Sequence, residues 1–153
     1  MQSPLATAST STFEALGLLL PDAEPTAEQR GAPLARGVRV AFAGPFTGAL
    51  TVRVSEDVAT TLAANMLGVH VVASEDRLVH DALGEVANVI CGNLLPELAG
   101  RAAVFHLGAP EPVSASAGPT SGPDRPSLAV TLGVDAGRAE VALHVDPVGA
   151  DAP

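Results

Sequence analysis

The sequence is poor in aromatic residues: it has no Trp, no Tyr and only four Phe among 153 residues. Because 47% of the residues are nevertheless hydrophobic, the core has to be built from Val, Leu, Ala and Ile. Such a chain offers few rings on which nucleic-acid bases could stack, and its net charge of −9 repels phosphate backbones and anionic lipid head groups. We therefore expect neither nucleic-acid binding nor membrane binding.

Cysteine and long hydrophobic runs are also scarce. The one cysteine, Cys91, cannot form an internal disulfide, and no histidines or cysteines have the spacing of metal ligands. The longest apolar run near the start, "LGLLL", is too short to span a bilayer, and "MQSPLATAST" lacks the positive charge that opens a secretory signal. We expect a cytoplasmic protein that has no metal site and no cofactor of its own.

The length is that of one domain with a hydrophobic core of useful size. Near the start, Ser11 and Glu14 have the spacing of a capping box, which predicts a short first helix from Ser11. The stretch "PDAEPTAEQRGAPLARG" is rich in Pro and charge without a sustained period, which favours a solvated linker. We therefore expect an N-terminal helix and flexible linker over 1–36, the main domain over 37–146 and a disordered tail over 147–153.

Alternating hydrophobic residues predict two β-hairpins. "GVRVAFAG" and "GALTVRV" alternate on either side of the turn residues "GPFTG", and "SLAVTLGV" and "RAEVALHV" meet at "DAG". "AAVFHLG" and "PVSAS" are interpreted as two further strands, and "AGPTSGPDRP" as an exposed loop.

Two helices are expected between the hairpins and the later strands. Ser55 comes just before two acidic residues, and Gly68 has the place of a left-handed C-terminal residue, so one helix should lie between them. A longer helix should begin after Ser74 and run at least to Leu95, where Pro96 should end or kink it. The predicted fold class is α+β, a mainly antiparallel sheet with long helices packed on one face.

The long helix carries a narrow polar stripe. At about 100° per residue, Asp81, Glu85, Asn88 and Gly92 fall within about 60° of one another. The opposite side, which should face the sheet, is apolar and consists of Val79, Leu83, Val86, Ile90 and Leu94. Gly84 on the flank of the stripe and Gly92 within it each cost about 1 kcal/mol of helix propensity relative to Ala, so we expect them to allow close approach by another chain. By spacing alone, an ordinary solvated helix face is the more frequent explanation of such a stripe.

The segment "DALGEVANVICGN" resembles the signature of the CheC/CheX/FliY family of chemotaxis phosphatases, in which Asp or Ser is followed after three residues by Glu and after two more by Asn. Asp81, Glu85 and Asn88 match these positions. The resemblance extends over roughly 37–145, and the single Glu-x-x-Asn is similar to CheX rather than to CheC-type members, which carry two. The family's later proline has its counterpart in Pro110, one residue earlier than the pattern places it.

This resemblance implies hydrolysis of the aspartyl phosphate on a CheY-like response regulator. The regulator would supply a Mg²⁺ ion and a lysine, so the phosphatase would only have to position the attacking water. Asn88 would hold that water and Glu85 would pair with the regulator's lysine, while Asp81, Gly84 and Gly92 would contact the partner. The resemblance also implies a homodimer, and the final hairpin has no lysines to protect its edge.

Two alternatives remain open. A protein with this fold could bind a receiver domain without hydrolysing its phosphate, or it could be a dimerisation module whose stripe has no partner. The intact pair of Glu85 and Asn88 argues against the second alternative and only mildly separates the first from the phosphatase.

Overall fold

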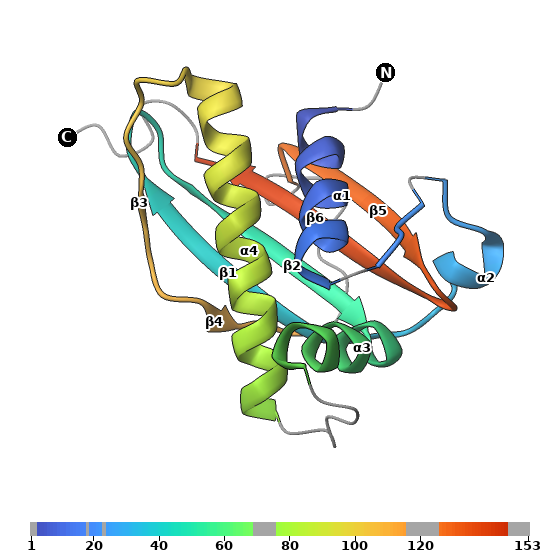
Figure 1. Cartoon of the computed structure of the whole chain (residues 1–153). Helices are drawn as coiled ribbons and strands as arrows, with labels where there is room; N and C mark the ends of the chain where they lie inside the picture. The colour runs from blue at the N-terminus through green and yellow to red at the C-terminus, as the bar shows by residue number, and fades with distance from the viewer. Residues whose placement is uncertain (1–2, 18, 23, 69–75, 116–125, 147–153) are drawn as a thin grey trace.

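The computed structural model describes residues 3–17, 19–22, 24–68, 76–115 and 126–146. These residues form one antiparallel sheet with the order β3-β1-β2-β6-β5, in which β4 also pairs with β1. The helices α1, α3 and α4 lie on one face of this sheet (Figure 1). The predicted α+β class is confirmed. The strands are β1 Leu34–Ala43, β2 Gly48–Ser55, β3 His106–Leu107, β4 Glu111–Pro112, β5 Leu128–Val134 and β6 Gly137–Val145, and the helices are α1 Pro4–Gly17, α2 Ala27–Arg30, α3 Glu56–Leu67 and α4 Asp76–Ala99.

Both predicted hairpins are present. In β1 and β2 the alternating residues pair across the strands, with Val38 opposite Val52 and Val40 opposite Leu50, and all four are buried on the helix side of the sheet. β5 and β6 pair in the same way and turn at Asp135, whose φ of 52° is one that Asp tolerates better than most residues. The core is formed where these inward residues meet α1, α3 and α4.

The two further predicted strands are much shorter than expected. In these two segments only β3 and β4, which have two residues each, pair with β1, whereas strands were expected over 102–108 and 112–116. Pro110 lies between β3 and β4 and lacks the N–H that a continuous ladder requires, which is a reason for the interruption there. The predicted loop at 117–126 lies almost entirely outside the described residues, and the predicted tail lies wholly outside them.

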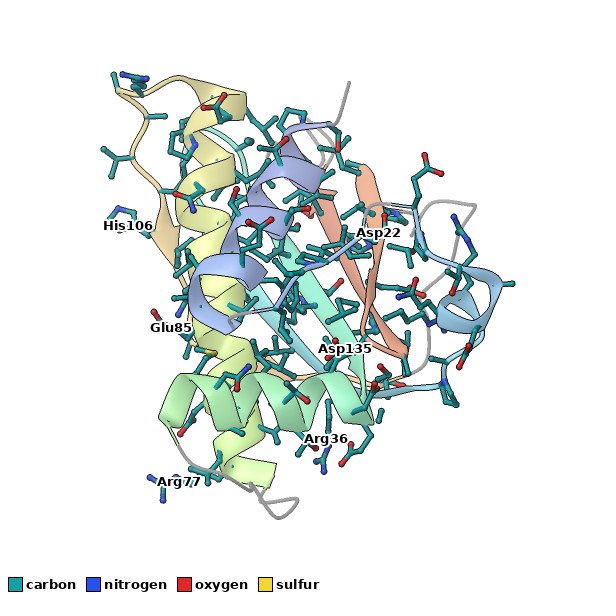
Figure 2. All side chains as sticks on the ribbon, turned by 45° about the vertical axis from the view of Figure 1, so that its right-hand side comes forward. Asp22, Arg36, Arg77, Glu85, His106 and Asp135 are labelled. Carbon is teal, nitrogen blue, oxygen red and sulfur yellow. The ribbon has the colours of Figure 1, made fainter. Side chains whose placement is uncertain are left out.

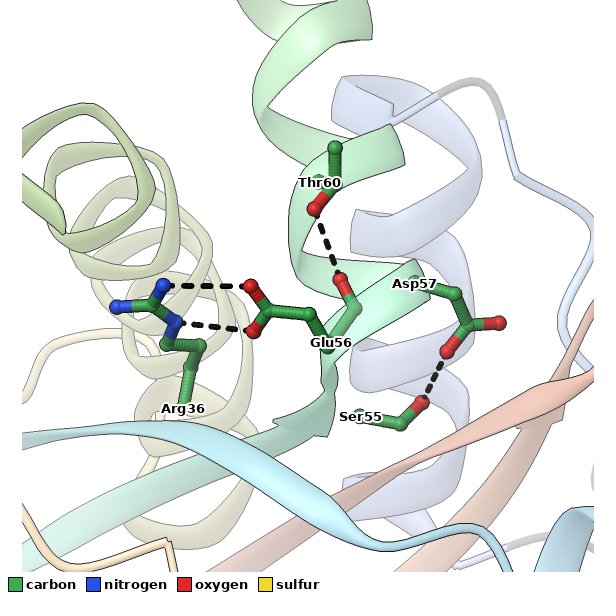
Figure 3. Close-up of polar contacts among 5 residues, drawn as sticks. All are labelled: Arg36, Ser55, Glu56, Asp57 and Thr60. Atoms are coloured by element: carbon green, nitrogen blue, oxygen red, sulfur yellow. Dashed lines mark hydrogen bonds and ion pairs between the residues drawn. The ribbon is translucent and has the colours of Figure 1, made fainter. Parts of the chain in front are cut away.

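The helix after Ser55 is confirmed, and Gly68 ends it with a left-handed φ of 71°. Ser55, however, does not cap the helix through its side chain. Its hydroxyl donates to Asp57 Oδ1 at 2.7 Å (Figure 3) and accepts from the N–H of Arg138 at 3.0 Å. Ser55 thereby connects the start of α3 to β6.

The long helix α4 is also confirmed over the predicted span, although Ser74 lies outside the described residues. Pro96 does not end the helix, which continues to Ala99. The last turn is closed by a hydrogen bond from the N–H of Gly100 to the carbonyl of Pro96 at 2.8 Å, and Gly100 has a φ of 100°. A proline near a helix end removes one donor but leaves its carbonyl free to accept.

The first helix begins earlier than predicted. It starts at Pro4, and the side chain of Ser3 accepts a hydrogen bond from the N–H of Ala6 at 3.1 Å. Ser11 therefore lies inside the helix and is exposed, so the predicted capping box does not form. Proline is well suited to the first helical position because its missing N–H would have no helical partner there.

The predicted flexible linker is wrong for the part that the structure describes. Thr26 and Gln29 form a capping box at the start of α2, and the Gln29 side chain donates to the carbonyl of Asp135 at 2.9 Å. Asp22 exchanges two backbone hydrogen bonds with Gly133, at 2.7 and 2.8 Å. The segment therefore lies along the β5–β6 hairpin, and α1 contributes to the same core as the sheet. The boundary predicted at residue 37 does not separate two structural units.

Candidate functional site

The polar stripe of α4 faces away from the core, as the sequence predicts. Asp81, Glu85 and Gly92 are exposed and Asn88 is half-buried. The opposite side of the helix is fully packed, since Val79, Leu83, Val86, Ile90 and Leu94 each expose 2% or less of their surface. Because these five residues are packed against the core, the helix is a rigid support for the side chains on its outer face.

Asn88 differs from the other stripe residues because its Oδ1 atom is buried and has no hydrogen-bond partner among the described residues. An amide has one acceptor and two donor hydrogens, and leaving such a group unpaired inside a protein costs about 1–3 kcal/mol. A buried polar atom without a hydrogen-bond partner calls for an explanation, and a catalytic role is one of the reasons for which proteins keep such atoms.

Glu85 projects from α4 on the outer side of the molecule (Figure 2). Neither Glu85 nor Asp81 forms an ion pair within the part of the chain that the structure describes. Their negative charges are therefore directed to solvent, where they can attract a cationic group of a partner.

The two glycines of α4 have different surroundings. A Cβ at Gly92 would meet nothing within 4 Å, so this position is open to another molecule. A Cβ at Gly84 would lie 2.8 Å from Pro110 Cγ, and Gly84 is buried. The close approach that Gly84 permits is thus made by its own chain, and the predicted partner contact at Gly84 is wrong. Pro110 reaches it because β3 and β4 hold the intervening residues against β1.

Cys91 lies beside the stripe but is fully buried. Burial raises the pKa of its thiol to about 12, so the reactive thiolate is scarce at neutral pH. The thiol is therefore no nucleophile and packs as a small buried hydrophobic residue.

Among the described residues, no three His, Cys, Asp or Glu side chains come together in a way that could hold a metal ion. Nor does any described helix have the length and apolar character needed to cross a bilayer. The stripe consists of two carboxylates, an amide and an open glycine, which can attract a cationic side chain of a partner and orient a water molecule.

Arg77, at the start of α4, was not singled out from the sequence, and His80 was interpreted only as a surface histidine on the helix flank. Arg77 is exposed and continues the stripe by one turn toward the helix N-terminus, and His80 is half-buried on the flank. The signal was present in the sequence, because Arg77, Asp81 and Glu85 follow one another at intervals of four residues.

Several solved structures that are similar to this fold are chemotaxis proteins. CheX from Vibrio vulnificus is 18% identical, with a TM-score of 0.72 over 94% of each chain. CheX from Desulfovibrio desulfuricans is 20% identical, with a TM-score of 0.70 over 94% of this chain and 97% of that one. A CheX–CheY–BeF₃–Mg²⁺ complex from Borrelia burgdorferi matches with 19% identity and a TM-score of 0.65, over 94% of this chain and 96% of that one. The chain therefore has the CheX/CheC-like fold.

The sequence itself identifies the family. The profile described as "Chemotaxis phosphatase CheX" matches residues 36–132, which is more than half of the chain. The search with this chain found no matching curated protein sequence. The chain belongs to the chemotaxis phosphatase CheX family, as the motif on α4 predicts, and is an enzyme of that kind.

Proposed function

We propose that the protein hydrolyses the aspartyl phosphate of a CheY-like response regulator, and that the outer face of α4 enters the regulator's active site. The observation that carries this proposal is the placement of Glu85 and Asn88, which lie three residues apart on the exposed side of a rigid helix. The Borrelia burgdorferi relative was solved as a complex with CheY, BeF₃ and Mg²⁺, which supports a partner of this class.

In this proposal the protein supplies geometry rather than a nucleophile. An acyl phosphate is already reactive, so a catalyst gains most by holding water in line with the bond that breaks. Asn88 orients that water through its amide, and its unsatisfied oxygen atom is consistent with such a role. The Mg²⁺ ion that offsets the charge of the phosphoryl group belongs to the regulator.

Glu85 has the second role, which is to pair with the lysine of the regulator and so fix the helix against it. Asp81, one turn earlier, is an outer contact of the same stripe, and Gly92, one turn after Asn88, lets the partner's backbone approach. We also propose that the enzyme is cytoplasmic and homodimeric, as the sequence predicts.

Replacement of Asn88 by Ala tests the proposal. We expect dephosphorylation of the phosphorylated receiver domain to slow by a factor on the order of 100 or more, as for other positioned catalytic groups. Binding of the beryllofluoride-activated receiver domain should largely survive, because the charged contact at Glu85 is untouched.

Asn93→Ala is the matched control, since Asn93 is an exposed amide on the same helix but outside the stripe. It should hydrolyse the phosphate at the parent rate. If Asn88→Ala is also as fast as the parent, the catalytic assignment is wrong. If the parent binds the receiver domain without dephosphorylating it, the non-catalytic alternative is correct.

A further inference from the structure

A cavity of about 490 Å³ lies beside the start of α4. Its walls come from α4, from the beginning of β1 and from the residues around β4. This volume is within the range of about 300–1,000 Å³ that is typical of ligand sites. The cavity has an apolar part formed by Val79, Leu83 and Val113, and its polar groups are Arg36, Arg77 and His80.

Among the residues that the structure describes, the polar side chains that line this cavity all carry hydrogen-bond donors, and none of them is a carboxylate. This is unusual in a chain with 17 acidic residues, eight basic residues and a net charge of −9. Arg36 is bound to Glu56, through Nε to Oε2 at 3.1 Å and through Nη2 to Oε1 at 3.3 Å (Figure 3). Its charge is thus offset, and among the described lining residues Arg77 supplies the positive charge that no described carboxylate pairs with.

Arg77 connects the cavity to the stripe. Four residues advance a helix by about 40° around its axis, so Arg77, Asp81 and Glu85 form one gently turning row. Figure 2 shows Arg77 and Glu85 on the same side of the molecule. Within the described residues Arg77 has no ion-pair partner. The row therefore presents a positive charge at its first position and negative charges at the next two.

We infer that this cavity receives an acidic side chain from the surface of the response regulator. Arg77 forms the ion pair with its carboxylate, His80 adds a hydrogen bond, and the apolar wall accommodates the methylene groups of the side chain. This inference rests on the proposed function and names a second contact for it. Arg77 and Glu85 are eight residues apart, so the regulator has to present an acidic residue about 12 Å from its lysine.

The order of charges along the helix makes the contact specific for one register and one orientation of the regulator. A regulator that meets Glu85 with a cation and Arg77 with an anion can bind in one register only, because a shift or reversal brings like charges together. Arg77 therefore determines which regulator is accepted and how the helix is oriented, while Asn88 and the water do the chemistry.

The experiment compares Arg77→Glu with Arg101→Glu. Both replace an exposed arginine by glutamate, but Arg101 follows the far end of α4 and lies outside the cavity. We expect Arg77→Glu to raise the KM for the phosphorylated receiver domain about tenfold or more, the effect of losing a charge-assisted hydrogen bond, with kcat nearly unchanged. Arg101→Glu should leave both constants at the parent values. Circular dichroism should show that both variants are folded.

A charge reversal on the regulator completes the test. Acidic residues on the receiver-domain surface are changed to Arg one at a time, and one of them should restore the KM of Arg77→Glu while impairing the parent enzyme. The inference is overturned if Arg77→Glu and Arg101→Glu behave alike, or if no reversal on the regulator gives such rescue. A parent enzyme without activity on any receiver domain would instead contradict the proposed function, so the two failures can be told apart.

Discussion

At the level of single residues, replacement of Glu85 is predicted to weaken binding of the receiver domain, whereas replacement of Asn88 is predicted to slow hydrolysis and leave binding largely intact. Glu85 is exposed and has no described ion-pair partner, so Glu85→Ala should leave the thermal unfolding temperature nearly unchanged. Affinity for the activated receiver domain should fall by about 1–3 kcal/mol, because a charged contact is lost from the interface, and turnover should fall with it.

Binding isotherms for Glu85→Ala should be compared with those for Glu97→Ala, which removes another exposed carboxylate from α4. Glu97 lies near the helix end, away from Asn88, and its loss should have little effect on affinity. Equal affinities for the parent and Glu85→Ala would show that the carboxylate is a solvated surface group and would remove it from the proposed interface.

At the level of the helix, the two glycines of α4 predict opposite changes in stability. Gly92→Ala adds a methyl group in open space and improves helix propensity, so it should stabilise the protein by up to about 1 kcal/mol. Gly84→Ala gains the same propensity but drives a methyl group into the ring of Pro110, and a net loss of about 1–2 kcal/mol is expected. Denaturant unfolding of the two variants measures both changes. If both variants are stabilised equally, the ring of Pro110 moves away from the new methyl group without a cost in stability.

Sequence reasoning succeeds on α4 because the information is local. The buried and exposed sides repeat every turn, so the stripe with Glu85 and Asn88 can be found from spacing alone. The surroundings of Gly84 cannot be found from spacing, because they depend on Pro110. Pro110 is distant in sequence and is brought near because β3 and β4, on either side of it, pair with β1. The same dependence on distant partners explains why strands were predicted too long around β3 and β4.

Local signals also compete, as the first helix shows. Ser11 and Glu14 have the spacing of a capping box, but Ser3 followed by Pro4 begins the helix earlier, and nothing in the local pattern ranks one start above the other. The resemblance to the CheX family was interpreted correctly, because a motif on one helix needs no knowledge of the distant parts of the chain.

At the level of the whole molecule, α1 is expected to be essential for stability even though the sequence predicted it to lie outside the main domain. Phe13 is fully buried at 0% exposure among residues of the common core. Phe13→Ala should lower the free energy of unfolding by about 3–5 kcal/mol, the usual loss for an aromatic core residue. Leu20→Ala is the control, because Leu20 is 87% exposed and should change stability by no more than about 0.5 kcal/mol. If Phe13→Ala has as small an effect, α1 is dispensable.

The open edge of the sheet leads to the last prediction, the homodimer. β5 pairs with β6 on one side, and on its other side the only bridge within the described residues joins Gly133 to Asp22. β5 carries no charged residue and no proline, the features that usually keep an exposed edge from pairing with another chain. Two copies can therefore pair their β5 strands and continue one sheet through the dimer.

Sedimentation at tens of micromolar should give twice the monomer mass. Ala129→Lys places a charge on an exposed position of β5 and should shift the protein toward monomer, whereas Ala99→Lys at the end of α4 should not. A parent protein that remains monomeric contradicts the homodimer itself. A dimer that survives Ala129→Lys contradicts the pairing through β5 and leaves another face of the molecule as the interface.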